Sequence, residues 1–426
     1  MHFKYKGLHY GLLSAALLNS GLATAAELKP LSDAEMAAET GQALFNLSYL
    51  APGQTGNTNA GMGFYKLGME AQLEINANIK KLQLGCGGAN GAGNCDIDID
   101  NLSLSGTSTT SDGRTASSAI ITNPFIQFAI KNPTTASTRE LAGVKLSAEA
   151  IQGLLTLGTE NSSSTNGINS FSGYMVTQAT TGTVTTAARA TGSGLTQTNL
   201  GTVITGRARS SLGLINTSFT STAYDLGLSA ASGSLALPSQ VISGRRINTA
   251  NLTGTAMVSG INLSGTINAG TGIGIPISGD LSGVINNLGV NVAVSENLGY
   301  IHKVNLNGTA AALSLQAQDI LWPGAKSTAQ RGWWLEFSDP IDIGDVTPQD
   351  PVVITDDVVK ATLGKVSQYL TANPVNCGVF AITCLAGTIN VRSVDLTGQF
   401  VPMNLSNLVL KNQDFVPNCY GGLTFC

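Results

Sequence analysis

The clearest signal in the sequence is the stretch YKLGMEAQLEINANI at residues 65–79, in which odd positions are apolar or small and even positions are polar or glycine. A period of two is that of a β-strand, whose alternate side chains point to opposite faces. The stretch therefore predicts a strand that buries its odd-numbered face. After Lys80 and Lys81 the apolar residues are Leu82 and Leu84, on even positions, which predicts a β-bulge that restores the buried face.

This strand is expected to return as a hairpin. A loop rich in glycine and asparagine lies between Cys86 and Cys95, and the sequence DIDID at 96–100 then alternates again. The pattern predicts an antiparallel hairpin whose tip is closed by a Cys86–Cys95 disulfide. At about 3.3 Å per residue the first strand would span on the order of 50 Å, a length that belongs to extended β structures.

Alternation recurs along most of the chain, so we expect a mainly β fold with long, bulged antiparallel strands in an elongated sheet, a sandwich or a barrel-like body. We expect this β body to span residues 43–338. Prolines at 340, 348 and 351 then favour a boundary before a smaller C-terminal module at 339–426. That module should contain one helix, which begins after Thr355, ends before Asn373-Pro374 and carries one apolar face, formed by Val359, Leu363, Val366 and Leu370.

A short unit, Asn or Asp followed by Leu, a small polar residue and Gly, recurs at residues 251–254, 262–265, 280–283, 305–308 and 395–398. The spacing is irregular, which is not typical of a solenoid of fixed period. Glycine inside a strand indicates a bend or the close approach of another chain segment. We interpret the unit as a feature of curved strands.

The first 26 residues have the features of a secretory signal peptide: Lys4 and Lys6, a short apolar segment, and small residues before Glu27. The apolar segment is too short for a membrane helix, and no later stretch offers 18 apolar residues in succession. Without the signal peptide, which holds two of the 22 basic residues and none of the 26 acidic ones, the net charge is −6. Such a charge argues against nucleic acid as a partner.

The composition of the chain is that of a folded protein with a neutral polar surface. Charged residues make up only 11% of the chain, glycine occurs 50 times, and the hydrophobic fraction of 42% is too high for a disordered chain. All six cysteines lie in the exported part, as close sequence pairs that predict three local disulfides. The predicted pairs are Cys86 with Cys95, Cys377 with Cys384, and Cys419 with Cys426.

A short helical motif is expected at residues 27–42. Ser32 and Glu35 form a capping box, and Gly41 can end the helix. Because two helical turns are not stable alone in water, the motif should dock on another surface, either its own β body or a partner. We assign the docking role to seven residues, Leu31, Ser32, Asp33, Glu35, Met36, Gly41 and Gln42.

The segment LSDAEMAAETGQ at 31–42 resembles the post-signal motif of proteobacterial surface proteins, including pilus-assembly proteins of the Fil type. Its combination with the hairpin segment CDIDIDNLSL at 95–104 and the segment AGVKLSAE at 142–149 is similar to the Fil-type proteins in particular. The resemblance covers about the first third of the chain. It implies a cell-surface or filament-associated role, and it supplies no enzymatic residues.

Candidate chemistry is sparse. Asp96, Asp98 and Asp100 share one strand face, where three carboxylates repel unless water or a cation such as Ca²⁺ compensates them. A solvated face and a Ca²⁺ site both stay open, and no other cofactor is indicated. His302, the single histidine of the mature chain, lies on an apolar strand with no nucleophile motif nearby, so no catalytic residues are predicted.

We therefore expect an exported structural or adhesive protein rather than an enzyme with a small-molecule substrate. It would belong to the periplasm, the outer surface or a pilus of a Gram-negative bacterium, as a component of or an assembly factor for a filament. Its partners would be other surface-assembly proteins or further copies of itself. The alternative is an outer-membrane β-barrel, which export and alternation favour but which the scarcity of aromatic residues does not.

Overall fold

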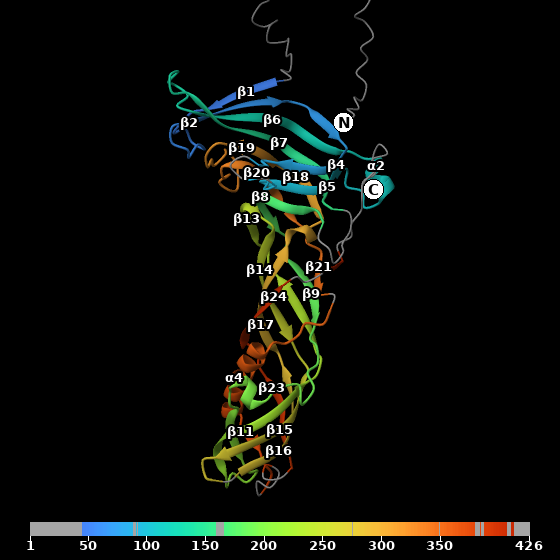
Figure 1. Ribbon diagram of the computed structural model, residues 1–426, viewed down its shortest axis with the longest axis vertical. Helices are drawn as coiled ribbons and strands as arrows, with labels where there is room; N and C mark the ends of the chain where they lie inside the picture. Colours follow the sequence, from blue (N-terminus) through green and yellow to red (C-terminus); the bar gives the residue numbers. More distant parts are fainter. Residues whose placement is uncertain are drawn as a thin grey trace, which may run out of the picture.

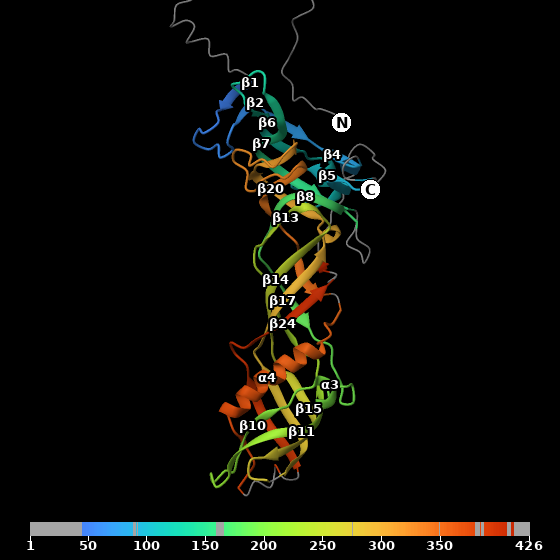
Figure 2. The ribbon, with the colours of Figure 1, turned by 60° about the vertical axis from the view of Figure 1, so that its left-hand side comes forward.

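The computed structural model describes residues 45–87, 91, 93–158, 166–274, 276–348, 350–379, 384, 387–406 and 410–412. The described chain is elongated and consists mainly of β-strands, with one long helix toward its C-terminal end. Three sheets follow one another along the long axis: a large sheet that we call the head, a middle sheet and a distal sheet (Figures 1 and 2). The predicted mainly β class is confirmed.

The head is a twelve-stranded sheet whose main strand order is β1-β2-β6-β7-β19-β20-β8-β5-β4. Strands β13, β18 and β3 pair with β8, β7 and β6 beside this path, and the short helix α2 (Ser111–Thr115) follows β5. The strands are β1 (Phe45–Leu50), β2 (Met62–Met69), β3 (Gln72–Ile75), β4 (Ala77–Leu84), β5 (Ile97–Ser105), β6 (Ala119–Lys131), β7 (Glu140–Thr156), β8 (Ile168–Thr177), β13 (Val241–Ile247), β18 (Lys303–Thr309), β19 (Ala311–Gln316) and β20 (Gly332–Ile341).

The remaining strands form three smaller sheets. The middle sheet contains β24 (Phe400–Ser406), β17 (Leu288–Asn297), β14 (Thr249–Val258), β12 (Ser232–Leu237) and β9 (Thr180–Thr185), in that order. The distal sheet contains β22 (Val375–Asn376), β10 (Thr205–Arg209), β11 (Asn216–Leu228), β15 (Ile261–Thr271), β16 (Pro276–Asn286) and β23 (Gly387–Asp395). A small pair joins β21 (Asp345–Pro348) to β25 (Leu410–Asn412), and the short helices are α3 (Gln197–Leu200) and the 3₁₀ helix η2 (Leu298–Tyr300).

One continuous β-ribbon connects the middle and distal sheets. Strand β14 pairs with β17 and β15 with β16, and the register does not change at the junction, because Val258 pairs with Leu288 and Ile261 with Ile285. Even-numbered residues of β14 are buried, whereas odd-numbered residues of β15 are buried. The ribbon therefore buries one of its faces in the middle sheet and the other face in the distal sheet. The buried apolar residues of the two sheets belong to one hydrophobic core.

The recurring unit supplies this core with leucine. All five of its leucines are buried: Leu252, Leu263, Leu281, Leu306 and Leu396. In strands the glycine two positions later lies on the same face as the leucine. A Cβ on Gly254 or Gly265 would collide with the carbonyl oxygen of Ala236 or Asp225, respectively. Glycine thus permits the neighbouring strand to approach closely.

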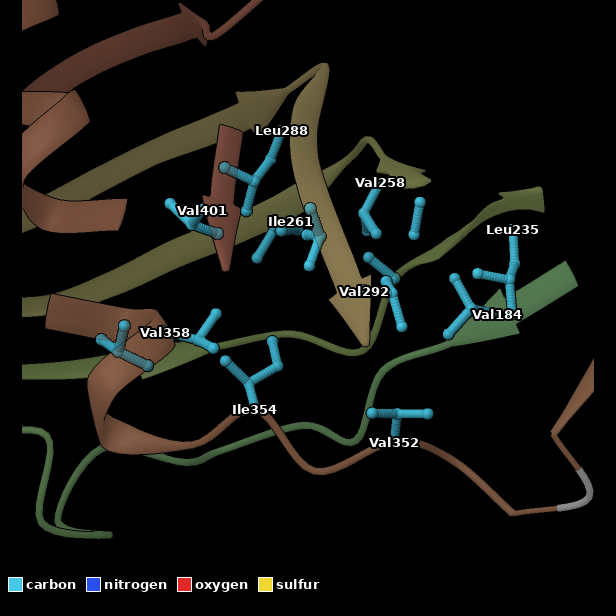
Figure 3. Close-up of a cluster of buried hydrophobic side chains, with 14 of the residues drawn as sticks. Val184, Leu235, Val258, Ile261, Leu288, Val292, Val352, Ile354, Val358 and Val401 are labelled. Atoms are coloured by element: carbon cyan, nitrogen blue, oxygen red, sulfur yellow. The ribbon is translucent and has the colours of Figure 1, made fainter. Parts of the chain in front are cut away.

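The helix α4 (Asp356–Ala372) closes one side of the core. Thr355 is its N-cap residue, the first turn carries Asp356 and Asp357, and Asn373 follows its last residue, as predicted. Its apolar face, formed by Val359, Leu363, Val366 and Leu370, is buried. Figure 3 shows Val358 at the start of this helix near Ile354, in the same cluster of buried side chains as the strand residues Val292 and Ile261. The helix is therefore stabilised mainly by the packing of its apolar face against the core and less by the intrinsic helix propensity of its residues.

Two of the three predicted disulfides are confirmed: Cys86–Cys95 closes the tip of the β4–β5 hairpin, and Cys377–Cys384 closes a loop after β22. Cys419 and Cys426 lie outside the described residues. The single long strand is not observed, because the chain forms β2, β3 and β4 with breaks at Glu70–Ala71 and Asn76. The predicted bulge at Lys80 and Lys81 is wrong, since β4 keeps one register with β5 throughout.

The segment after residue 339 contributes to the sheets of the preceding residues. Strand β23 pairs in parallel with β16, and β24 pairs in parallel with β17. Strand β20 itself runs from Gly332 to Ile341, across the boundary that the prolines suggested. The division into a β body and a C-terminal module stays a prediction.

Candidate functional site

Two rows of apolar side chains cross six neighbouring strands on one face of the head sheet. Cross-strand pairing places the residues of each row side by side on β1, β2, β6, β7, β19 and β20. We call this surface the wing face. Its rows are Leu47, Leu67, Ile126, Leu146, Leu313 and Leu335, and Tyr49, Tyr65, Phe128, Val144, Leu315 and Trp333.

The wing face has its most exposed residue on the edge strand of the sheet. At its inner end Leu313, Trp333 and Leu335 are half-buried against the main core. Leu146 on β7 is 51% exposed and Leu47 on β1 is 73% exposed. With strands about 4.8 Å apart, the face covers on the order of 300 Å². Apolar patches of this size on a protein surface often mark binding sites.

The opposite face of the sheet is covered over β2, β6, β7 and β20. Residues such as Phe64 on β2 and Trp334 on β20 are buried there against Ile320 and Trp322 of the loop at 317–331. The prediction that the odd-numbered face is buried agrees with β3, in which Leu73 and Ile75 are half-buried and their even-numbered neighbours are exposed. In β2 the buried side is the opposite one: Phe64 is 1% exposed, whereas Leu67 of the odd-numbered set is 41% exposed. The reason is that the covering loop packs on the face opposite the odd-numbered residues.

Strand β1 is at the end of the strand order, so it is an edge strand of the head. Within the described chain it pairs with β2 alone. All but one of its six residues are exposed, and Tyr49 stacks on Tyr65 with ring centroids 4.4 Å apart. An edge strand presents backbone N–H and C=O groups to which another strand can pair.

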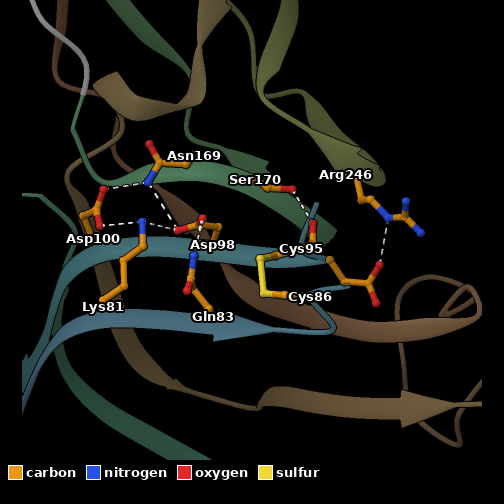
Figure 4. Close-up of a disulfide and its surroundings, with 10 residues drawn as sticks. Lys81, Gln83, Cys86, Cys95, Asp98, Asp100, Asn169, Ser170 and Arg246 are labelled. Atoms are coloured by element: carbon orange, nitrogen blue, oxygen red, sulfur yellow. Dashed lines mark hydrogen bonds and ion pairs between the residues drawn. A yellow bond between two sulfur atoms is a disulfide. The ribbon is translucent and has the colours of Figure 1, made fainter. Parts of the chain in front are cut away.

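The three aspartates of the hairpin are compensated by basic side chains. Lys81 Nζ lies 2.7 Å from Asp98 Oδ1 and 2.9 Å from Asp100 Oδ1, and Asn169 donates a hydrogen bond to Asp100 Oδ2 (Figure 4). Burial raises the pKa of Asp98, but hydrogen bonds from Lys81 and its neighbours outweigh burial and hold the pKa below its usual value. Lys81 thus compensates Asp98 and Asp100, for which the sequence left both a solvated face and a Ca²⁺ site open.

Asp96 is separate from the other two carboxylates and is buried. Its Oδ1 accepts a hydrogen bond from Arg246 Nε at 3.0 Å, and its Oδ2 accepts one from the backbone N–H of Trp333 at 3.1 Å. A Cβ on Gly85 or Gly332, both at positive φ, would collide with this carboxylate. Asp96 therefore joins the hairpin to β13 and β20. Across the described residues, no group of three His, Cys, Asp or Glu side chains converges as a metal site requires.

His302 has a structural environment. Its Nδ1 lies 2.7 Å from the carbonyl oxygen of Leu157, and burial lowers its pKa while that hydrogen bond opposes the change.

The docking residues Leu31, Ser32, Asp33, Glu35, Met36, Gly41 and Gln42 lie outside the described residues. The wing face was missed in the sequence because alternation alone does not reveal which side of a strand is covered.

No helix in the described part of the chain is long and apolar enough to cross a membrane. Comparisons with models of protein families, with curated protein sequences and with solved structures find no match to this chain. The candidate site therefore depends on the geometry of the wing face and of the β1 edge.

Proposed function

We propose that this chain is an exported structural or adhesive protein of the bacterial surface, a component of or an assembly factor for a pilus or similar filament. The observation that carries the proposal is the wing face, which lies at one end of an elongated β protein. Exposed apolar faces of this extent favour association with another surface. The resemblance of residues 31–42 to Fil-type proteins supports the same class of function.

The partner that suits this surface is a protein segment in extended conformation. Such a segment could pair with the backbone of β1 and place alternate apolar side chains beside Leu47 and Leu67. Main-chain hydrogen bonds would provide affinity, and the apolar rows would select the side chains. A strand from a neighbouring subunit of the assembly has this chemistry.

The composition and the disulfides support an extracytoplasmic location. Disulfides persist in oxidising compartments, and Cys86–Cys95 and Cys377–Cys384 are both formed. The neutral polar surface agrees with a structural role outside the cell. The net charge of the mature chain gives no support for nucleic acid as a partner.

The experiment compares cells that carry the wild-type gene, a deletion, Leu47→Asp or Met257→Asp. Met257 is the matched control, because it is an exposed apolar residue of β14 in the middle sheet, away from the wing face. Fractionation of sheared surface material and electron microscopy measure assembly. Leu47→Asp should be exported and folded but absent from the surface fraction, and Met257→Asp should behave as wild type.

Normal assembly of the Leu47→Asp protein would contradict the proposed role of the wing face. Identical surface structures in the deletion strain and in the wild type would contradict the proposed function as a whole. Extraction that requires detergent, with heat-modifiable migration on gels, would instead favour the outer-membrane alternative.

A further inference from the structure

A cavity of about 210 Å³ lies on the covered side of the head sheet. Lys145 stands between Val144 and Leu146 on β7, so it points away from the wing face and toward the loop at 317–331. Lys145 as a whole residue is only 5% exposed. The same cavity is lined by Phe125, Trp322, Trp334 and Glu336.

The groups in direct contact with the Lys145 ammonium are neutral. Its Nζ donates a hydrogen bond to the carbonyl oxygen of Pro323 at 3.2 Å, and it lies 5.5 Å from the ring centroids of both Phe125 and Trp322. Within the described chain, no carboxylate lies within ion-pair distance of Lys145; the ion pairs found there involve other residues. Burial of an ammonium without a carboxylate partner is costly.

Glu336, the buried carboxylate of this cavity, is engaged elsewhere. Its Oε1 accepts a hydrogen bond from the backbone N–H of Lys326 at 2.8 Å, and its Oε2 accepts one from Ser327 Oγ at 3.1 Å. The other acid at the cavity, Glu149, is exposed and pairs with Lys66 at 3.3 Å. These contacts fix the covering loop and leave the positive charge of Lys145 without a direct anionic partner.

We propose that this cavity binds a small organic carboxylate whose anionic group pairs with Lys145 Nζ. An ammonium has three N–H donors, and Pro323 accepts one of them, so donors remain for a charge-assisted hydrogen bond to the ligand. The apolar part of the ligand would contact Phe125 and Trp322. The volume is below the roughly 300–1,000 Å³ of drug-sized pockets, which limits the ligand to about the size of benzoate.

The test is calorimetric titration of the mature protein with sodium acetate, butyrate and benzoate, and with benzamide as the uncharged analogue of benzoate. At least one carboxylate should bind saturably, and benzamide should bind at least tenfold more weakly than benzoate. Lys145→Met, which keeps the length of the side chain, should weaken carboxylate binding at least tenfold. Lys66→Met is the matched control, because Lys66 contacts the same Phe125 ring at 4.3 Å from a half-buried position.

The affinity for carboxylate should fall as the pH rises through about 8, because burial lowers the pKa of Lys145 to about 8. The negative charge of Glu336 raises this pKa, and the positive charge of Lys66 lowers it further. A second measurement does not depend on any variant. Carboxylate should slow acylation of Lys145 by acetic anhydride in the wild-type protein, as followed by mass spectrometry, without slowing that of Lys66.

Absence of saturable binding for all three carboxylates would overturn the proposal. So would equal binding of benzamide and benzoate, or acylation of Lys145 that carboxylate does not affect. Because this site is on the covered side of the sheet, its failure would leave the wing face and the proposed surface role unaffected.

Discussion

Replacement of Lys145 by methionine should make the free energy of unfolding change less with pH in the alkaline range. Burial lowers the pKa of Lys145 to about 8 from an ordinary value of 10.5, whereas the unfolded chain keeps the ordinary value. Between these two pH values the unfolded chain retains a proton that the folded protein has released. The folded wild type therefore gains stability as the pH rises through this window.

The difference between the two pKa values corresponds to about 3 kcal/mol, which is the cost of the buried charge at pH 7. Lys145→Met removes this cost, but it also removes the hydrogen bond to Pro323 and the contacts with two aromatic rings, which contribute about 1 kcal/mol each. The variant should thus be equal to or about 1–2 kcal/mol more stable than wild type at pH 7. Relative to wild type the variant should lose most of about 3 kcal/mol by pH 10.5, so that it is then the less stable of the two proteins.

Urea unfolding of both proteins at pH 7, 9 and 10.5, in buffers without carboxylate, measures this difference. Other titrating groups are shared by the two proteins and cancel in the comparison. Lys66→Met is the control at pH 7, where loss of an exposed ion pair should change stability by no more than about 1 kcal/mol. A difference between wild type and Lys145→Met that changes by less than about 1 kcal/mol over this range would refute the reasoning.

Three further outcomes are expected. Asp96→Ala should lower the free energy of unfolding by about 3 kcal/mol, because it leaves a guanidinium and a buried N–H without their acceptor; urea titration would contradict this with a loss below about 1 kcal/mol. Leu252→Ala should cost about 2–4 kcal/mol in the same assay, and Leu47→Ala within about 0.5 kcal/mol, because only the first residue is buried. Peptide mapping without reductant should find Cys419 joined to Cys426, and a free thiol at either would contradict three local disulfides.

Features that depend on a few neighbouring residues were predictable from the sequence. The helix α4 follows from an N-cap, two aspartates and an apolar stripe within 18 residues, and it begins and ends as those signals indicate. The Cys86–Cys95 hairpin tip likewise depends on a short loop between two alternating segments. In both cases the determining interactions are local, so they are visible in the order of the residues.

The roles of individual charged residues were not predictable in this way. Lys81 was placed at a bulge, yet an unbroken register with β5 sets it opposite Asp100 and beside Asp98. Lys145 lies within an alternating strand and gives no sign of burial, because the loop that covers it follows some 170 residues later. Such roles depend on which distant strands become neighbours.

The sequence by itself determined the β class, the C-terminal helix and the disulfides Cys86–Cys95 and Cys377–Cys384, because periodicity, capping and cysteine spacing act over short distances. The tertiary structure alone decided which face of each alternating strand is covered. In the head sheet both faces carry apolar residues, and the loop at 317–331 covers the side of Phe64 and Trp334 while Leu47 and Leu146 stay exposed. That choice follows from contacts between segments that lie 178 to 262 residues apart, and it creates both the wing face and the Lys145 cavity.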